Sequence, residues 1–525
     1  MQKALSTALK LALGLSLLPI AANGAVLEEV VVTAQKREQG MQDVGIAVTA
    51  FTGRQLEQLG YTNAQEISAL APGVSTIQPN GPSNYALAIR GVAQNDFISN
   101  QESPVSIYVD EVYVSQMSSA GFLLFDMERV EILRGPQGTL FGRNATGGLA
   151  HYVTRKPSEE ANGYAQLTGG SFSQFKFEGA AGFGLSENVL GRISLSTHNN
   201  GGYVDNRVLG DDINNADDIA GRVQLLFKLN EGLEFLLNAR ASKQDIRTGF
   251  FENVSSRDLN GDGLGELTPE LTNFNGYRDT DGDVFAGDYD KFGFQEMDSQ
   301  GISGTFKWDV NENVVMTSVT DFHSIERDYI EDSDASPLPD FNFFLVTDAE
   351  QFSQELRFEG TNATSRWTAG IYYLDIDVSD ANGAETPLLG VAEAFGLPPG
   401  GLTDGSGVLP TTEGDGTFQG NDNPYTTQTE SWSLFGQLEY DFSETLTGIA
   451  GFRWISEDKS HFYQNNFVDF QPGSKQRNGN PNVLFTAGEY SGNLDRNLWS
   501  AKLHLDWRPN EDLLVYGSWN RGVKG

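Results

Sequence analysis

Two acidic runs in the middle of the chain have residue types and spacing that could bind a metal ion. In the first run, oxygen-bearing side chains and a central glycine fall at Asp258, Asn260, Asp262, Gly263 and Glu266. Alternating oxygen ligands with glycine at the sixth position are typical of the start of a calcium-binding loop. The twelfth position, where such a loop places a bidentate glutamate, holds proline instead.

The second run has the same alternation. Asp279, Asp281 and Asp283 are spaced by two, Val284 stands where the glycine belongs, and Asp290 reaches the twelfth position. Both runs predict possible calcium binding in loops, with no cofactor required for folding or activity. The alternative is a solvated acidic loop, because like charges at this density tend to stay in water.

The rest of the composition excludes several other kinds of chemistry. The chain has 71 acidic against 35 basic residues and a net charge of -36, which excludes a nucleic-acid binder that relies on a basic surface. It has no cysteine, and its five histidines lack metal-ligand spacing. No nucleophile–base pair or carboxylate pair can be named, so no catalytic residue and no enzyme activity are predicted. The alternative of a secreted β-rich enzyme would require such a converged site.

The first 24 residues predict an export signal. Lys3 and Lys10 precede an apolar run at 11–20, and small residues follow at 21–25. A membrane anchor is the alternative, but the run is too short to cross about 30 Å of hydrocarbon.

A short segment after this signal could add as a strand to a partner. It consists of Glu29, Val30, Val31, Val32, Thr33 and Ala34. Three consecutive valines near a free terminus extend easily, and an extended segment can pair with the exposed edge of a partner's sheet. A simple edge strand within the chain is the alternative.

The remaining chain has two regions with different residue patterns. Up to about residue 160 the pattern is mixed, with helix-like stretches at 53–59 and 64–70 and short β runs at 106–113 and 129–133. Beyond it, apolar and polar residues alternate. In 222–229 the apolar residues share one face, as a strand requires.

The second region predicts about thirteen strands, including 428–440 and 494–506, separated by alternately short and long breaks. This alternation favours an outer-membrane barrel, in which apolar side chains meet lipid and short periplasmic turns alternate with long extracellular loops. A secreted all-β protein is the alternative.

An ordered series of motifs then identifies a family. The series comprises VGIAVTAF at 44–51, APGV at 71–74, IRG at 89–91, SIYVD at 106–110 and VEILRGPQGTLFGRNATGGLAHYVTRKP at 130–157. In this order the motifs resemble the plug of TonB-dependent outer-membrane receptors, and SQELR at 353–357 continues the resemblance weakly. The stretch LAHY at 149–152 departs from the family pattern.

The resemblance implies an all-β transmembrane barrel, 22-stranded in the family, with an N-terminal α+β plug in its lumen. It divides the chain into a signal peptide (1–24), a TonB box and linker (25–40), a plug (41–160) and a partial barrel (161–525). Glu29 to Ala34 would be the TonB box, pulled by the TonB–ExbB–ExbD complex to open a path through the outer membrane.

The family's commonest cargo is a ferric siderophore complex. An importer of carbohydrate, cobalamin or another organic nutrient is the alternative. A passive porin is a further alternative, against which the TonB box and plug argue. About thirteen strands instead of 22 predict a fragment of a longer protein.

The plug arginines suggest a latch. Arg90 and Arg134 lie in IRG and LRG turns, and we expect them to pair with inward barrel carboxylates, of which Glu355 is the best candidate. Breaking a buried pair costs about 3–5 kcal/mol, whereas a surface pair contributes about 0–1 kcal/mol. Surface pairing is the alternative. A phosphate-binding loop at 138–148 is excluded because no Lys-Ser/Thr follows its glycines.

Overall fold

The computed structural model describes most of the chain. The described residues are 30–61, 63–78, 85–96, 98–120, 122–248, 277, 279, 282–337, 341–385, 418–470 and 482–525. The predicted signal peptide therefore lies outside the described residues.

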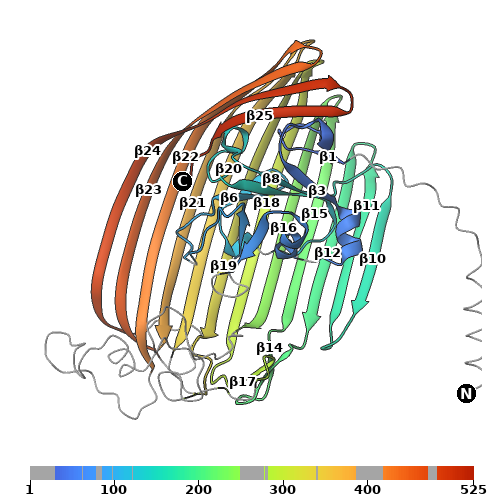
Figure 1. Ribbon diagram of the computed structural model, residues 1–525. Coiled ribbons are helices and arrows are strands. Elements are labelled where there is room, and N and C mark those ends of the chain that lie inside the picture. The colour runs from blue at the N-terminus through green and yellow to red at the C-terminus, as the bar shows by residue number, and fades with distance from the viewer. Residues whose placement is uncertain are drawn as a thin grey trace, which may run out of the picture.

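A single antiparallel sheet of 13 strands forms the wall of the molecule and curves around a smaller domain (Figure 1). Its strands, in both chain and spatial order, are β10 (Asn162–Gly169), β11 (Phe175–Ser186), β12 (Val189–Asn200), β15 (Ala216–Asn230), β16 (Leu233–Thr248), β18 (Gly293–Asn311), β19 (Val314–Asp332), β20 (Asn342–Thr361), β21 (Ser365–Glu385), β22 (Phe418–Ser443), β23 (Leu446–Phe470), β24 (Asn482–Asn510) and β25 (Leu513–Arg521). The predicted strand number and all-β barrel class are confirmed. In this sheet β10 and β25 form the two edges.

The connections follow the predicted rule. Short turns such as 187–188 and 444–445 join strands at one end, and long connections such as 201–215 and 386–417 join them at the other. The short-turn end is the periplasmic end and the long-loop end is the extracellular end. Several strands are much longer than predicted, since β22 and β24 have 26 and 29 residues.

Burial in the wall is the reverse of that in a soluble protein. On β22, Trp432 and Leu434 are 54% and 56% exposed, whereas the alternating Ser431 and Ser433 are buried. Since period two places these residues on opposite faces, the outer face is apolar and the lumen face is polar. This is the arrangement that lipid outside and a hydrated, plugged lumen require.

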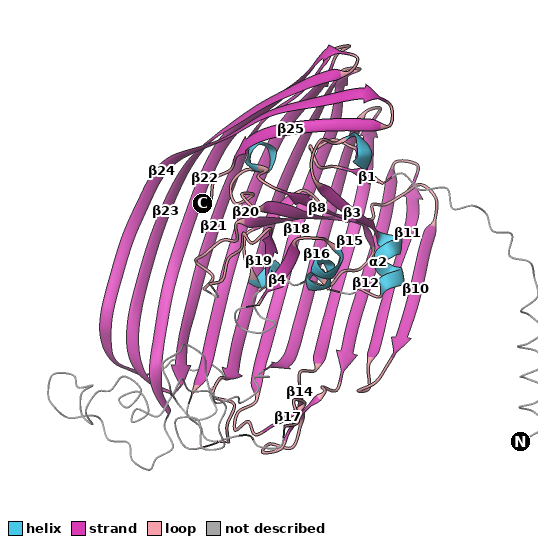
Figure 2. Cartoon of the chain, viewed as in Figure 1, coloured by secondary structure: helices cyan, strands magenta, loops and turns pink. Residues whose placement is uncertain are grey.

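The domain inside the wall is the plug (Figure 2). Its mixed sheet has the order β3 (Val48–Thr52), β8 (Met127–Arg134), β9 (Gly148–Thr154), β6 (Val105–Val109) and β7 (Val112–Val114). The small elements beside it are β1 (Val31–Val32), β2 (Gln39–Gly40), η1 (Met41–Asp43), α2 (Gly53–Leu59), η2 (Ala64–Leu70), β4 (Val74–Ile77), β5 (Ala86–Ile89), η4 (Ser118–Ala120) and α3 (Gly138–Phe141).

The helix and strand segments predicted for the plug are found at the predicted positions. Helix α2 occupies the predicted 53–59 and is closed by a Thr52 capping box and by Gly60 in the left-handed conformation. The stretch 64–70 is a 3-10 helix, and 106–113 divides into the β6–β7 hairpin. A core that includes Ile67, Leu87, Ile132 and Tyr152 holds these elements together.

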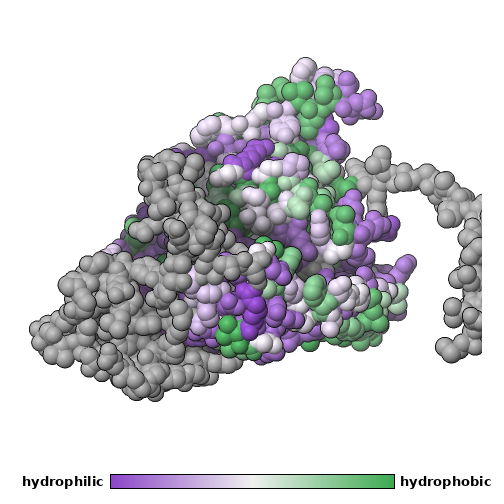
Figure 3. Space-filling view, turned by 60° about the horizontal axis from the view of Figure 1, so that its bottom comes forward, coloured by the Kyte–Doolittle hydropathy of each residue, from purple (hydrophilic) through white to green (hydrophobic). Residues whose placement is uncertain are grey.

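At the extracellular end, a three-stranded sheet forms from loop segments β14 (Asp212–Ile213), β13 (Val204–Asn206) and β17 (Ala286–Gly287). Figure 3, turned to bring this end forward, shows many hydrophilic side chains on the visible described surface. Within the described ranges, no helix has the length and apolar character needed to cross a bilayer.

Candidate functional site at the plug and barrel wall

The N-terminal segment, residues 30–37, is docked inside the molecule. Strand β1 pairs with β2, and the backbone N–H of Met41 donates to the carbonyl of Val30 at 2.9 Å. Val32 and Ala34 are buried to 0% and 2% exposure. Glu29, the first residue of the predicted TonB box, lies outside the described residues. The other five therefore fold back on the plug instead of extending freely.

Thr33 is held by three plug side chains. Its backbone N–H and its Oγ1 donate to Oε1 of Glu131 at 2.8 and 3.0 Å. Its Oγ1 also lies 3.3 Å from Nδ1 of His151 and accepts from Arg129 Nη2 at 3.3 Å. Glu131 is completely buried and also accepts from Arg129 Nε at 2.8 Å. This cluster fixes the segment to β8 and β9.

His151 occupies this cluster in its neutral form. The backbone N–H of Glu111 donates to Nε2 of His151 at 3.3 Å, which assigns the ring proton to Nδ1, facing Thr33. Burial lowers the pKa of His151, although the carboxylates of Glu131 and Glu111 oppose the shift. Protonation would place a second N–H against the backbone donor, so a neutral ring suits the docked segment.

Lys36 ties the same segment to the barrel wall. Its Nζ lies 3.5 Å from Glu355 Oε1 on β20 and 3.6 Å from Glu111 Oε2 on the plug. The Lys36 side chain is 2% exposed, and its Nζ lies over the rings of Tyr108 and Phe141. A buried cation paired with two carboxylates therefore joins the N-terminal segment, the plug and the wall.

The predicted pairing of Arg90 and Arg134 with Glu355 is wrong. Glu355 is occupied by Lys36 and by Arg357, whose Nη1 lies 2.8 Å from Oε1. Arg90 is exposed at a positive φ of 53°, and Arg134 donates to Thr49 within the plug. The turns that contain the two arginines direct them away from the wall at β20. Burial and the neighbouring Arg90 lower the pKa of Arg134.

Glu111 completes this cluster. Arg357 on β20 forms two hydrogen bonds with its carboxylate, and the bond from Nη2 to Oε1 is 3.1 Å long. Burial alone would raise the pKa of Glu111, but Arg357 and then Lys36 hold it well below its usual range. The carboxylate is therefore charged and binds the wall.

A second cluster centres on Arg143, which lies just after α3. Its guanidinium forms ion pairs with Glu102 of the plug and Glu457 of β23, all three side chains being 6% exposed or less. Lys459 Nζ lies 3.3 Å from Glu102, and Arg496 Nη2 lies 2.6 Å from Glu457. Burial opposes ionisation of Glu102, but Arg143 and Lys459 lower its pKa. Buried ion pairs between plug and wall therefore exist, but they are formed by other residues than those predicted.

Further contacts join the plug to the wall. Asp126, completely buried in its side chain, accepts from Arg192 Nε of β12 at 2.6 Å. Near the short-turn end, Arg508 of β24 lies 2.9 Å from Asp43. The N-terminal part of the plug therefore contacts the wall at its periplasmic end.

The structure describes only part of the two predicted calcium-binding runs. Asp258, Asn260, Asp262, Glu266 and Asp281 lie outside the described residues. Asp279 forms an ion pair with Arg207 at 2.7 Å, and Asp283 accepts the backbone N–H of Phe285 at 3.0 Å. Among the described residues of this run, Asp279 is thus paired with an arginine and Asp283 with a backbone N–H, and the calcium prediction for the run as a whole stays a prediction.

Sequence reasoning missed Lys36, Glu111, Glu102 and Glu457. One signal was available, because Lys36 lies two residues after the predicted TonB box, within the predicted linker. The carboxylates carried no such signal, since period two places Glu457 in the lumen without indicating which plug residue faces it.

Two family models match the chain. Residues 41–149 match the TonB-dependent receptor plug domain, and residues 239–525 match the TonB-dependent receptor-like β-barrel. The barrel match alone covers more than half of the chain.

Known proteins agree with this assignment. The pesticin receptor of Yersinia pestis is 30% identical over 228 residues, which cover 41% of this chain and 32% of the relative. The vitamin B12 transporter BtuB of Photobacterium profundum is 26% identical over 186 residues, covering 35% of this chain and 30% of the relative. The matches thus cover about a third of these relatives' length.

Solved structures share the fold. The ferric yersiniabactin uptake receptor FyuA from Yersinia pestis superposes with a TM-score of 0.69 at 16% identity, covering 90% of this chain and 64% of that one. The siderophore receptor PiuA from Acinetobacter baumannii superposes with a TM-score of 0.68 at 13% identity, covering 93% of this chain and 66% of that one. With a plug inside a wall that is apolar outside, these findings show that the chain belongs to the TonB-dependent receptors of the outer membrane.

Proposed function

We propose that this receptor imports a scarce nutrient, most specifically a ferric siderophore complex, using energy supplied by TonB with ExbB and ExbD. The observation that carries the proposal is the docking of the N-terminal segment. Val30 to Ala34 lie on the plug, and Lys36 two residues later binds both the plug and the wall. A pull on this segment would act directly on the contacts that keep the lumen blocked.

The covalent order of the contacts sets the order in which they would yield. Tension applied from the N-terminal side first reaches the Val30–Met41 hydrogen bond and the β1–β2 pairing, and then the Thr33–Glu131 hydrogen bonds. It next reaches Lys36 with Glu355 and then Arg37 with Glu439 on β22. The Arg143 cluster is reached last, because it lies more than a hundred residues further along the chain. Partial displacement of the plug would therefore begin at the periplasmic end.

The segment also has the chemistry for a TonB partner. Residues 30–32 are consecutive valines, and once released they could add as a strand to a sheet edge. Release must come first, because Val32 is buried in the docked state. Residues 29–34 thus remain the proposed TonB box, and the outer-membrane lipid is the receptor's second partner through its apolar outer face.

The choice of cargo is based on the related receptors. Several of these proteins are siderophore or ferric uptake receptors, and another is a vitamin B12 transporter. A ferric siderophore is the first candidate and cobalamin or another organic nutrient the second. The prediction that the chain is not an enzyme is confirmed by its family.

Uptake by cells that produce the receptor from its native gene tests the proposal. We expect radioactive iron supplied as a siderophore complex to accumulate under iron limitation only when both the receptor and TonB are present. If labelled cobalamin accumulates instead, cobalamin becomes the proposed cargo and the energised mechanism still stands. Equal uptake of either compound without TonB would refute the energised mechanism.

A further inference from the structure

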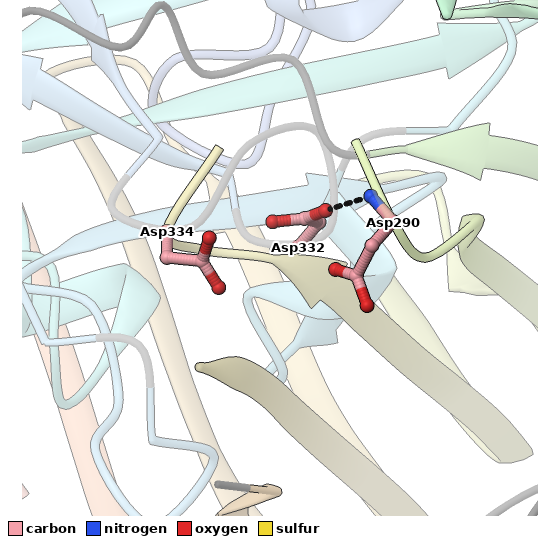
Figure 4. Close-up of side chains that lie close together, drawn as sticks. All are labelled: Asp290, Asp332 and Asp334. Carbon is pink, nitrogen blue, oxygen red and sulfur yellow. Dashed lines mark hydrogen bonds between the residues drawn. The ribbon is translucent and has the colours of Figure 1, made fainter. Parts of the chain in front are cut away.

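Three aspartates converge at the extracellular end of the wall, outside the plug contacts described above. Asp290 lies before β18, Asp332 is the last residue of β19, and Asp334 follows it by two. One carboxylate oxygen from each residue lies within 4.8 Å of the other two. Figure 4 shows the three side chains side by side, with Asp332 in the middle. Two separate loop regions therefore bring their negative charges together.

The middle carboxylate is fixed in orientation. Its Oδ2 accepts the backbone N–H groups of Asp290 and Lys291 at 3.0 and 3.4 Å, and its Oδ1 accepts that of Ala335 at 3.0 Å. The Asp332 side chain is fully buried. Asp290 is held beside it, and its own Oδ1 is closed off from solvent and accepts no hydrogen bond.

A neutral oxygen provides an independent indication of a ligand. Asn342, the first residue of β20, stands directly opposite Asp332 in the antiparallel register. Directly opposed residues project from the same face with Cβ atoms about 5 Å apart, so the Asn342 side chain lies beside that of Asp332. Asn342 is 1% exposed, and its Oδ1 has no hydrogen-bond partner. Such a buried oxygen is costly unless a donor or a cation meets it.

The lysine next to Asp290 in the sequence is paired with a carboxylate outside the cluster. Lys291 forms an ion pair with Glu385, which stands opposite Asn342 on its other side. The aspartates therefore repel one another in a partly desolvated place.

We propose that Asp290, Asp332, Asp334 and the amide oxygen of Asn342 form a calcium site. All four ligands are hard oxygens, and Ca²⁺ accepts six to eight such ligands in irregular geometry, whereas Mg²⁺ prefers a strict octahedron and keeps its waters. This site goes beyond the proposed transport function and does not depend on the cargo.

The site would stabilise a small extracellular unit. Tyr289 and Ala335, each adjacent in sequence to one of the ligands, are buried together with Val204 and Ile213 beneath the β14–β13–β17 sheet. Four buried side chains form a very small core. A cation that joins Asp290 to Asp332 and Asp334 would fix the loop before β18 to the end of β19 and thereby support this core.

Calcium binding to the purified, chelator-treated receptor in detergent tests the site. Titration calorimetry with CaCl₂ should give saturable binding, and Asp332→Asn should remove one equivalent or weaken it by about tenfold or more. Asn342→Ala should also weaken binding without changing the charge. Asp283→Asn is the matched control, because it removes the same charge from the same loop outside the cluster.

Thermal unfolding keeps the test independent of misfolding. In chelator, Asp290→Asn should unfold at the same temperature as the native receptor or higher, because one repelling charge is gone and Oδ1 of Asp290 accepts no hydrogen bond. Calcium should raise the melting temperature of the native receptor and of Asp283→Asn, but not that of Asp290→Asn. Absence of calcium binding, equal loss in Asp283→Asn and Asp332→Asn, or unchanged binding in Asn342→Ala would overturn the proposal.

Discussion

The backbone N–H of Thr33 donates a hydrogen bond to Oε1 of Glu131 at 2.8 Å, across 98 residues of sequence. This bond joins the N-terminal segment to the central part of the plug sheet. Because Glu131 is fully buried and also binds Arg129, the segment is held by a site with fixed geometry. Access of a periplasmic partner to the buried Val32 therefore depends on releasing Thr33.

Glu131→Gln should loosen the segment. The substitution removes the charge that binds the Thr33 N–H and Arg129, and weakening of such hydrogen bonds costs about 1–3 kcal/mol. Amide hydrogen exchange of residues 30–36 should accelerate accordingly. Glu128→Gln is the control, since Glu128 pairs with the same arginine but its side chain is 49% exposed. Equal exchange in both variants would contradict the assigned role of Glu131.

Docking of the segment should depend on pH through His151. Burial lowers the pKa of His151 in the folded plug, whereas the unfolded value is about 6.5. The undocked or unfolded state therefore binds the proton more readily than the docked state. The stability that neutral His151 contributes to docking is thus complete above about pH 6.5 and falls as the pH drops below this value. The protection factors of the amides of residues 30–36, which are exchange rates corrected for the intrinsic pH dependence of amide exchange, should be lower at pH 5.5 than at pH 7.5.

His151→Gln provides the comparison for that pH effect. Glutamine retains hydrogen-bonding groups but does not titrate, so the variant should lose most of the pH dependence. An identical pH dependence in the variant and the native receptor would assign the effect to other groups.

Arg143→Ala should destabilise the plug far more than Arg134→Ala. Loss of one partner from a buried ion pair costs about 3–5 kcal/mol, and the lower end applies because Lys459 and Arg496 still bind the two carboxylates. Arg134 makes a hydrogen bond to Thr49, worth about 0.5–1.5 kcal/mol. Urea titration followed by hydrogen exchange of the plug would measure both. Similar losses would show that the Arg143 cluster is not the latch.

The sequence predicted the wall well because lipid imposes a simple pattern. Apolar residues such as Trp432 and Leu434 alternate with polar ones over the membrane, and period two reveals each strand there. Beyond the membrane both faces of a strand are polar, so the alternation ends while the hydrogen-bonded ladder continues. This is why β24 runs from Asn482 to Asn510 although the pattern predicted 494–506.

The site was less predictable, because pairing between plug and wall depends on register in three dimensions. Glu355 was predicted to bind a plug arginine, but it pairs with Lys36 of the N-terminal segment and with Arg357 of its own strand. The sequence shows only that Arg90 lies in a turn, and the turn leaves it exposed. The convergence of Asp290 with Asp332 likewise depends on how two loops meet.

The most direct test of the account is the rate of energised uptake when the N-terminal segment is altered. Iron–siderophore uptake should be measured in cells with and without TonB for the native receptor, Val32→Pro and Val31→Ala. Proline at 32 removes a strand N–H and should abolish uptake, whereas Val31→Ala keeps the backbone and should transport. Uptake by the native receptor should also disappear without TonB. Undiminished uptake in Val32→Pro, or in cells without TonB, would contradict the account.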